Sequence, residues 1–146
     1  MPEKETLERA KQDAREGKAP STQAGEFVRE EIEHVREGKH GARSAKQAIA
    51  IGLSKARRAG VKLPAPKQAS QRTRKQAARD TRKGESAGKR KTSATRSRAT
   101  SRALKREGTS AASKTALSRH ARSAAAKRSP AARSRSAKKA AATRKK

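Results

Sequence analysis

The large apolar residues of this 146-residue chain are confined almost entirely to its first 63 positions. After Pro66 the only ones are Leu104 and Leu117, and the whole chain has one Phe and no Trp or Tyr. A packed core needs such side chains, because their burial offsets the conformational entropy lost on folding. The ten that precede residue 64 are Leu7, Phe27, Val28, Ile32, Val35, Ile49, Ile51, Leu53, Val61 and Leu63.

Charge is divided along the chain in the same way. The chain holds 41 Lys and Arg against 13 Asp and Glu, a formal net charge of +28. Residues 1–37 carry a net charge of −3, whereas residues 67–146 carry +24 in a sequence dominated by Ala, Ser, Thr, Lys and Arg. A segment this polar and this strongly basic is typical of disorder and of polyanion binding.

These two asymmetries predict the domain organisation. We expect a small helical head over residues 1–63, a proline linker over residues 64–66, and a disordered, basic, low-complexity tail over residues 67–146. The predicted fold class is therefore a mostly disordered chain with a small all-α N-terminal region. Two to three short helices would make up that region.

The helices of the head are predicted from apolar periodicity and from capping residues. A helix over residues 22–37 and a second over residues 45–59 should form a helical hairpin, with Gly38 ending the first and Ser44 capping the second. Gly60 suits the end of the second helix. A weaker helix over residues 2–16 has a poor apolar face, so we expect it to fray.

The basic tail carries the main functional signal. Lys and Arg displace the counterions condensed on nucleic acid, and the absence of aromatic residues argues against recognition of bases by stacking. The candidate phosphate-binding residues are Arg72, Arg74, Lys75, Arg82, Lys83, Lys89, Arg90, Lys91, Arg96, Arg98, Lys105, Arg106, Lys127, Arg128, Arg133, Arg135, Lys138, Lys139, Arg144, Lys145 and Lys146.

The second helix of the hairpin offers further candidate contacts to phosphate. These residues are Lys46, Lys55, Arg57 and Arg58, for which a solvated helix face is an equally good reading. The hairpin could also be read as a helix-turn-helix, but its core is thin and its connection contains two glycines. A small interaction or dimerisation module is the better interpretation.

Several classes of function are disfavoured. The chain has no Cys, and its three histidines, His34, His40 and His120, have no recognised metal-ligand spacing, so we expect no metal and no cofactor. No nucleophile–base pair or phosphate-binding glycine loop is present, so we expect no enzyme and no catalytic residues. The longest apolar stretch is far too short to span a membrane.

Two stretches of the head resemble a known family. They are Gly17-Lys18-Ala19-Pro20-Ser21-Thr22-Gln23-Ala24-Gly25-Glu26-Phe27-Val28 and Lys46-Gln47-Ala48-Ile49-Ala50-Ile51-Gly52-Leu53-Ser54-Lys55-Ala56-Arg57-Arg58-Ala59-Gly60. Together they resemble the bacterial domain-of-unknown-function family 6496, over residues 17–64. The resemblance implies a bacterial protein with a short helical head, often a basic tail, and no established activity. By composition alone, the tail is similar to histone-like proteins.

The sequence therefore predicts a histone-like, nucleoid-associated protein of the cytoplasm that binds DNA without sequence preference. Phosphate neutralisation by the tail would drive the binding. Two alternatives remain open: a basic protein associated with RNA or the ribosome, and an interaction or stress module whose head binds an unknown protein. The head could also form a homo-oligomer.

Overall fold

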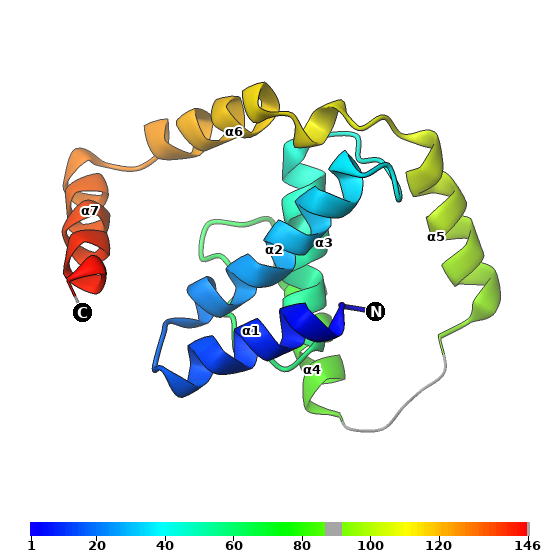
Figure 1. Ribbon diagram of the computed structural model, residues 1–146, viewed down its shortest axis with the longest axis horizontal. Helices are drawn as coiled ribbons and strands as arrows, with labels where there is room; N and C mark the ends of the chain where they lie inside the picture. Colours follow the sequence, from blue (N-terminus) through cyan, green and yellow to red (C-terminus); the bar gives the residue numbers. More distant parts are fainter. Residues whose placement is uncertain (87–91, 146) are drawn as a thin grey trace.

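The computed structural model describes residues 1–86 and 92–145, and over these ranges the chain is all-α. The expectation of a mostly disordered chain is wrong, because helices continue through the basic region (Figure 1). The elements are α1 (Lys4–Arg15), α2 (Pro20–Arg36), α3 (Ala45–Arg58), α4 (Gln71–Glu85), α5 (Ala94–Arg106), the 3₁₀ helix η1 (Ser110–Ala112), α6 (Lys114–Ala126) and α7 (Pro130–Arg144).

The hairpin of α2 and α3 is present and is built by the local signals expected for it. The Ser44 hydroxyl accepts a hydrogen bond from the Gln47 amide at 3.2 Å, which caps α3. Gly38 and Gly60 follow the two helices with φ of 74° and 95°. This left-handed conformation favours glycine, and it turns the chain out of each helix.

The two helices cross at Gly52, where their backbones nearly touch. A Cβ atom on Gly52 would lie 2.6 Å from the Val28 Cα atom and 3.0 Å from the Phe27 carbonyl oxygen. Only a residue without a side chain leaves room for so close a crossing. The close approach compensates for the small size of the alanines that α3 contributes to the core.

The first of two core clusters lies between α1, α2 and α3. Phe27 and Ala24 of α2 pack with Ala10, Ala56 and Val61, and all five are buried. Leu7 of α1 packs against the edge of the cluster, as do Leu53 and Leu63. The first helix is therefore docked rather than frayed, because Phe27 supplies the apolar surface that α1 itself lacks.

The second core cluster includes residues of the basic region. Val35, Ala42 and Ala48 of the head pack against Ala111 and Ala112 of η1, and all five are buried. Backbone hydrogen bonds hold the two segments together, from the Gly41 amide to the Leu104 carbonyl (2.9 Å) and from the Ala42 amide to the Gly108 carbonyl (3.1 Å). The basic region is therefore attached to the head by backbone hydrogen bonds and by buried alanines. Its lack of large apolar residues had suggested disorder, but these contacts do not need large side chains.

Helix α4, which follows the proline segment 64–66 in the sequence, packs on α3 of the head. Asp80 is buried, and one of its carboxylate oxygens accepts a hydrogen bond from the Ser54 hydroxyl of α3 at 2.6 Å. Gly84 lies so close to the end of α3 that a Cβ atom there would be 2.2 Å from the Arg57 carbonyl oxygen. Helices α1 to α4 thus form one packed unit, which we call the helical unit.

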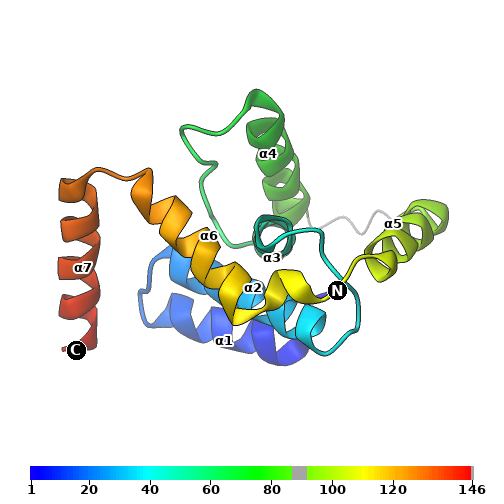
Figure 2. The same cartoon turned by 90° about the horizontal axis from the view of Figure 1, so that it is seen from above.

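Residues 92–145 form an extended arm. Figures 1 and 2 show α5, α6 and α7 following one another around the helical unit, with the arm attached through η1 and α6. Within the described ranges, neither α5 nor α7 makes an extensive contact with another helix. Each α-helix of the basic region follows a serine whose hydroxyl accepts a hydrogen bond from the backbone amide three residues on: Ser70, Ser93, Ser113 and Ser129.

Candidate nucleic-acid interface

The basic residues after Pro66 that are expected to bind phosphate are exposed wherever the structure describes them. Helix α4 carries Arg72, Arg74, Lys75, Arg82 and Lys83; helix α5 carries Arg96, Arg98, Lys105 and Arg106. Lys127 and Arg128 lie between α6 and α7; Arg133, Arg135, Lys138, Lys139 and Arg144 lie on α7, which Lys145 follows. Lys89, Arg90, Lys91 and Lys146 lie outside the described residues.

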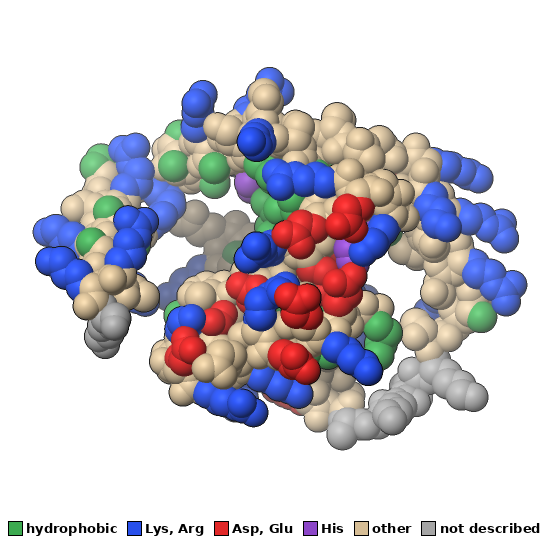
Figure 3. Space-filling model, viewed as in Figure 1, with side chains coloured by type: hydrophobic (Ala, Val, Ile, Leu, Met, Phe, Trp, Pro, Cys, Tyr) green, Lys and Arg blue, Asp and Glu red, His purple; other side chains and the backbone are tan. Residues whose placement is uncertain are grey.

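The arm has almost no negative charge to neutralise its cations. It contains 16 Lys and Arg and a single acid, Glu107. Glu107 pairs with Arg43 of the helical unit, at 3.6 Å. Within residues 92–145, therefore, no cation has a carboxylate partner in the arm itself. Figure 3 shows Lys and Arg side chains projecting along α5, α6 and α7.

The acids of the helical unit, by contrast, are largely paired with cations of the same unit, and Figure 3 shows them gathered over α1 and α2. Arg9 lies 2.7 Å from Glu26, and Lys18 lies 2.7 Å from both Asp13 and Glu16. Hydrogen bonds to Asp13 and Glu16 raise the pKa of the Lys18 ammonium. These cations are thus engaged within the protein, unlike those of the arm.

Glu30 is a buried acid held at the centre of the helical unit. Its carboxylate accepts a hydrogen bond from the Glu3 amide (3.1 Å) and another from the Lys55 ammonium (3.3 Å). Burial raises the pKa of Glu30, but these hydrogen bonds and a third from Thr6 outweigh burial and hold the pKa below its ordinary value. Glu30 therefore fastens α1 and α3 to α2.

The four candidate contacts on α3 divide into two pairs. Lys46 and Arg58 are exposed and accessible to a phosphate, and Arg58 Nε also lies 3.7 Å from Asp80 Oδ1. Lys55 points inward, with Nζ 2.6 Å from Glu31 Oε2. Arg57 is buried and donates to the Leu63 and Pro64 carbonyls, both at 3.2 Å. Lys55 and Arg57 are thus committed to holding the fold together, and burial lowers the pKa of the Arg57 guanidinium.

One basic feature was missed at the level of sequence. A groove of about 390 Å³ lies between α3 and α5, and its walls include Arg58 and Arg96 together with the hydroxyl side chains of Ser97, Thr100 and Ser101. Cations and hydroxyls are the groups that bind phosphate oxygens. The i, i+3, i+4 spacing of the hydroxyl residues 97, 100 and 101 could have indicated a shared polar face on this helix. That this face lies opposite α3 could not be predicted, because it depends on how the arm is attached.

Comparison with known proteins identifies the N-terminal part of the chain. Residues 4–68 match the family described as Family of unknown function (DUF6496). This region belongs to DUF6496. The resemblance predicted from residues 17–64 is thereby confirmed. No curated protein and no solved structure matches the chain.

The DUF6496 match coincides with structural boundaries. It begins at the first residue of α1 and ends three residues before α4, so it contains α1, α2, α3 and the proline segment. The buried acids Asp13, Glu30 and Glu31 lie inside the DUF6496 region, whereas the buried Asp80 on α4 and the whole arm lie outside it. Within residues 1–86 and 92–145, none of the helices has the length and hydrophobicity that a membrane span requires.

Proposed function

We propose that the chain is a nucleoid-associated protein of the cytoplasm that binds duplex DNA without sequence preference, through the arm and α4. The observation that carries this proposal is the exposure of nearly unneutralised cations along the arm, of which α5 and α7 have no extensive helix partner. Each phosphate that is neutralised releases condensed counterions, and this release supplies the free energy of binding.

The arrangement of the cations favours backbone contacts over the reading of bases. The arm contains no aromatic residue that could stack on a base. Arg and Lys of α5 and α7 occur on several sides of each helix, so no single face is specialised for insertion into a groove. Binding of this kind tolerates any duplex sequence and weakens steeply with salt.

A salt titration of the full chain on two unrelated duplexes tests the proposal. The test variant replaces three exposed cations of α7 with glutamine: Arg135, Lys138 and Lys139. The matched control replaces three exposed cations of α1: Lys4, Lys11 and Arg15. If each arm cation contacts one phosphate, the log–log salt slope should become shallower by about 0.9 per residue removed, roughly 2.7 in all.

The control variant should keep the original slope, and both duplexes should give the same result. A preference between the duplexes, or equal effects of the two triple variants, would contradict the arm-driven model. RNA has the same phosphate chemistry, so competition between duplex DNA and structured RNA at fixed salt distinguishes these two partners. Tighter binding of RNA would favour the ribosome-associated alternative.

A further inference from the structure

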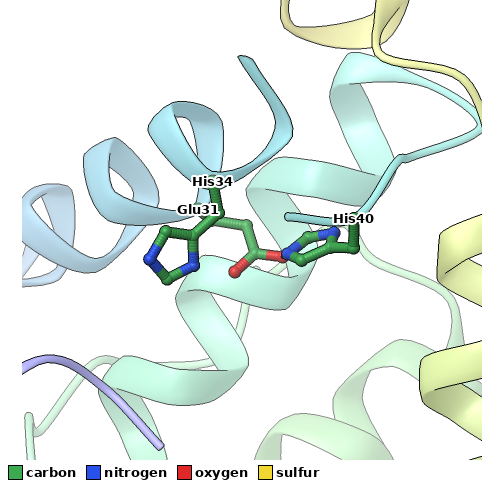
Figure 4. Close-up of side chains that lie close together, drawn as sticks. All are labelled: Glu31, His34 and His40. Carbon is green, nitrogen blue, oxygen red and sulfur yellow. The ribbon is translucent and has the colours of Figure 1, made fainter. Parts of the chain in front are cut away.

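Two of the three histidines lie beside a buried carboxylate. Glu31 and His34 are one turn apart on α2, and His40 follows in the loop before α3 (Figure 4). The Glu31 side chain is fully buried, while the side chains of His34 and His40 are 13% and 18% exposed. One oxygen or nitrogen from each of the three residues lies within 4.8 Å of the others.

The Glu31 carboxylate is incompletely satisfied by the protein. Lys55 Nζ lies 2.6 Å from Oε2, and His40 Nε2 lies 3.1 Å from Oε1. Neither contact has hydrogen-bond geometry, so both buried oxygens lack a hydrogen-bond partner. Burial of such a group is costly unless a cation compensates for it. Lys55 does so at Oε2 and leaves Oε1 facing His40.

The outer nitrogen of each histidine already has a hydrogen-bond partner. His40 Nδ1 lies 3.1 Å from the Gly41 carbonyl oxygen, to which it donates as Nδ1–H. His34 Nε2 lies 2.9 Å from Glu3 Oε1 and donates to that carboxylate. These bonds select the tautomers whose inner nitrogens, His40 Nε2 and His34 Nδ1, are unprotonated. In Figure 4 both inner nitrogens face the Glu31 carboxylate.

Outer hydrogen bonds of this kind fix the tautomer and the orientation of histidines that bind a metal. A metal-bound imidazole coordinates through one nitrogen and donates its other N–H to a carboxylate or a backbone carbonyl, and both kinds of acceptor are present here. With bonds of about 2.0–2.1 Å, neighbouring ligands of tetrahedral zinc lie roughly 3.4 Å apart. The 3.1 Å separation of His40 Nε2 from Glu31 Oε1 is close to that spacing.

We propose that Glu31 Oε1, His34 Nδ1 and His40 Nε2 bind a divalent first-row transition metal of the zinc type. Two imidazoles and one carboxylate are a donor set that Zn²⁺ accepts, with the fourth position left for water. Glu31 and His40 line the groove between α3 and α5, which gives a metal access from solvent. Glu3 and Gly41 act as positioning residues for the two rings.

The site also connects the head to the arm. His40 precedes Gly41 and Ala42, whose amides donate to the Leu104 and Gly108 carbonyls. A metal that fixes His40 against α2 therefore fixes the loop that holds the arm. This connection is independent of the proposed function, because metal binding can occur whether or not the arm binds DNA.

The test is a Co²⁺ titration of the untagged full chain, freed of nucleic acid, with Zn²⁺ added afterwards as competitor. The wild-type protein should bind one equivalent of Co²⁺ with visible d–d absorption, and Zn²⁺ should abolish that absorption. His34→Ala and His40→Ala should each lose the signal. His120→Ala is the matched control, since it removes a histidine of α6 outside the site, and it should bind normally.

A second variant, Glu3→Gln, tests the proposal even if a ligand variant fails to fold. The Glu3 side chain is 51% exposed, and it holds the His34 ring without being a proposed metal ligand. Loss of such an outer partner should weaken metal affinity by about 10- to 100-fold while helical content is retained. Absence of stoichiometric binding by the wild type would overturn the proposal. So would equal affinity of the wild type, His34→Ala and His40→Ala.

Discussion

Replacing Gly52 with alanine tests the close crossing of α2 and α3, and Gly25 provides the control. Both glycines lie inside helices, and neither has a positive φ. A Cβ atom on Gly25 would meet nothing within 4 Å, whereas one on Gly52 would lie 2.6 Å from Val28 Cα. Alanine at either position gains about 0.8–1 kcal/mol of helix propensity. The two variants therefore differ only in what the added methyl group meets.

The magnitude follows from the distance. Carbon atoms of non-bonded groups prefer a separation of about 3.5–4.0 Å, so the methyl group at Gly52 must push the helices apart by roughly 1 Å. Insertion of an extra methyl group into a packed interface costs about 1–3 kcal/mol. Gly25→Ala should thus be stabilised by up to about 1 kcal/mol, and Gly52→Ala should unfold more easily than Gly25→Ala by about 1–3 kcal/mol.

Thermal unfolding followed by far-ultraviolet circular dichroism measures this difference. For a unit as small as the helical unit, which spans residues 4–85, each kcal/mol of stability corresponds to about 4–8 °C in Tm. Gly52→Ala should therefore melt several degrees below Gly25→Ala under the same conditions. Equal melting temperatures for the two variants would refute the reasoning, because they would show that the helices do not approach closely at Gly52.

Three further predictions concern attachment and pH. Gly41→Ala should release the arm, since its Cβ would lie only 1.9 Å from the Glu107 carbonyl oxygen; faster hydrogen exchange at Ala42 would show this, and Gly108→Ala, which has open space, is the control. Asp80→Ala removes the acceptor for Ser54 and should speed tryptic cleavage within α4, unlike Glu85→Ala at an exposed position. Because the pKa of Glu30 is lowered on folding, its contribution to stability is present above an ordinary carboxyl pKa of about 4.5 and lost as the pH falls through the lowered value. Acid titration of Glu30→Gln should show less of this loss than the wild type.

The sequence predicted α2 and α3 well because their signals are local. Ser44 caps one helix, and Gly38 and Gly60 end the two, each by a rule that needs no knowledge of the rest of the chain. The helices of the basic region had such signals too, in Ser70 and its counterparts. Their composition was instead taken as a sign of disorder, which the structure contradicts.

The remaining features depend on contacts between distant segments. Nothing in the sequence around Ala111 and Ala112 indicates that they complete a core with Val35, because alanine is common everywhere in that region. Arg57 was considered a candidate phosphate contact because it lies in the last turn of a basic helix. Its burial depends on the segment after α3, which folds back so that the Leu63 carbonyl accepts a hydrogen bond from Arg57. Exposure of the arm cations, by contrast, was predictable from charge alone.

The serine caps of the basic region have a consequence for how its length can vary. Each of these helices is started by its own hydroxyl, and α5 and α7 have no extensive helix partner whose surface they must match. One such helix with its serine is a module of about 20 Å, at 1.5 Å per residue. Removal or duplication of the last module, which begins at Ser129, would therefore change the reach of the protein in whole steps and leave the buried acids, the two cores and the Gly52 crossing as they are.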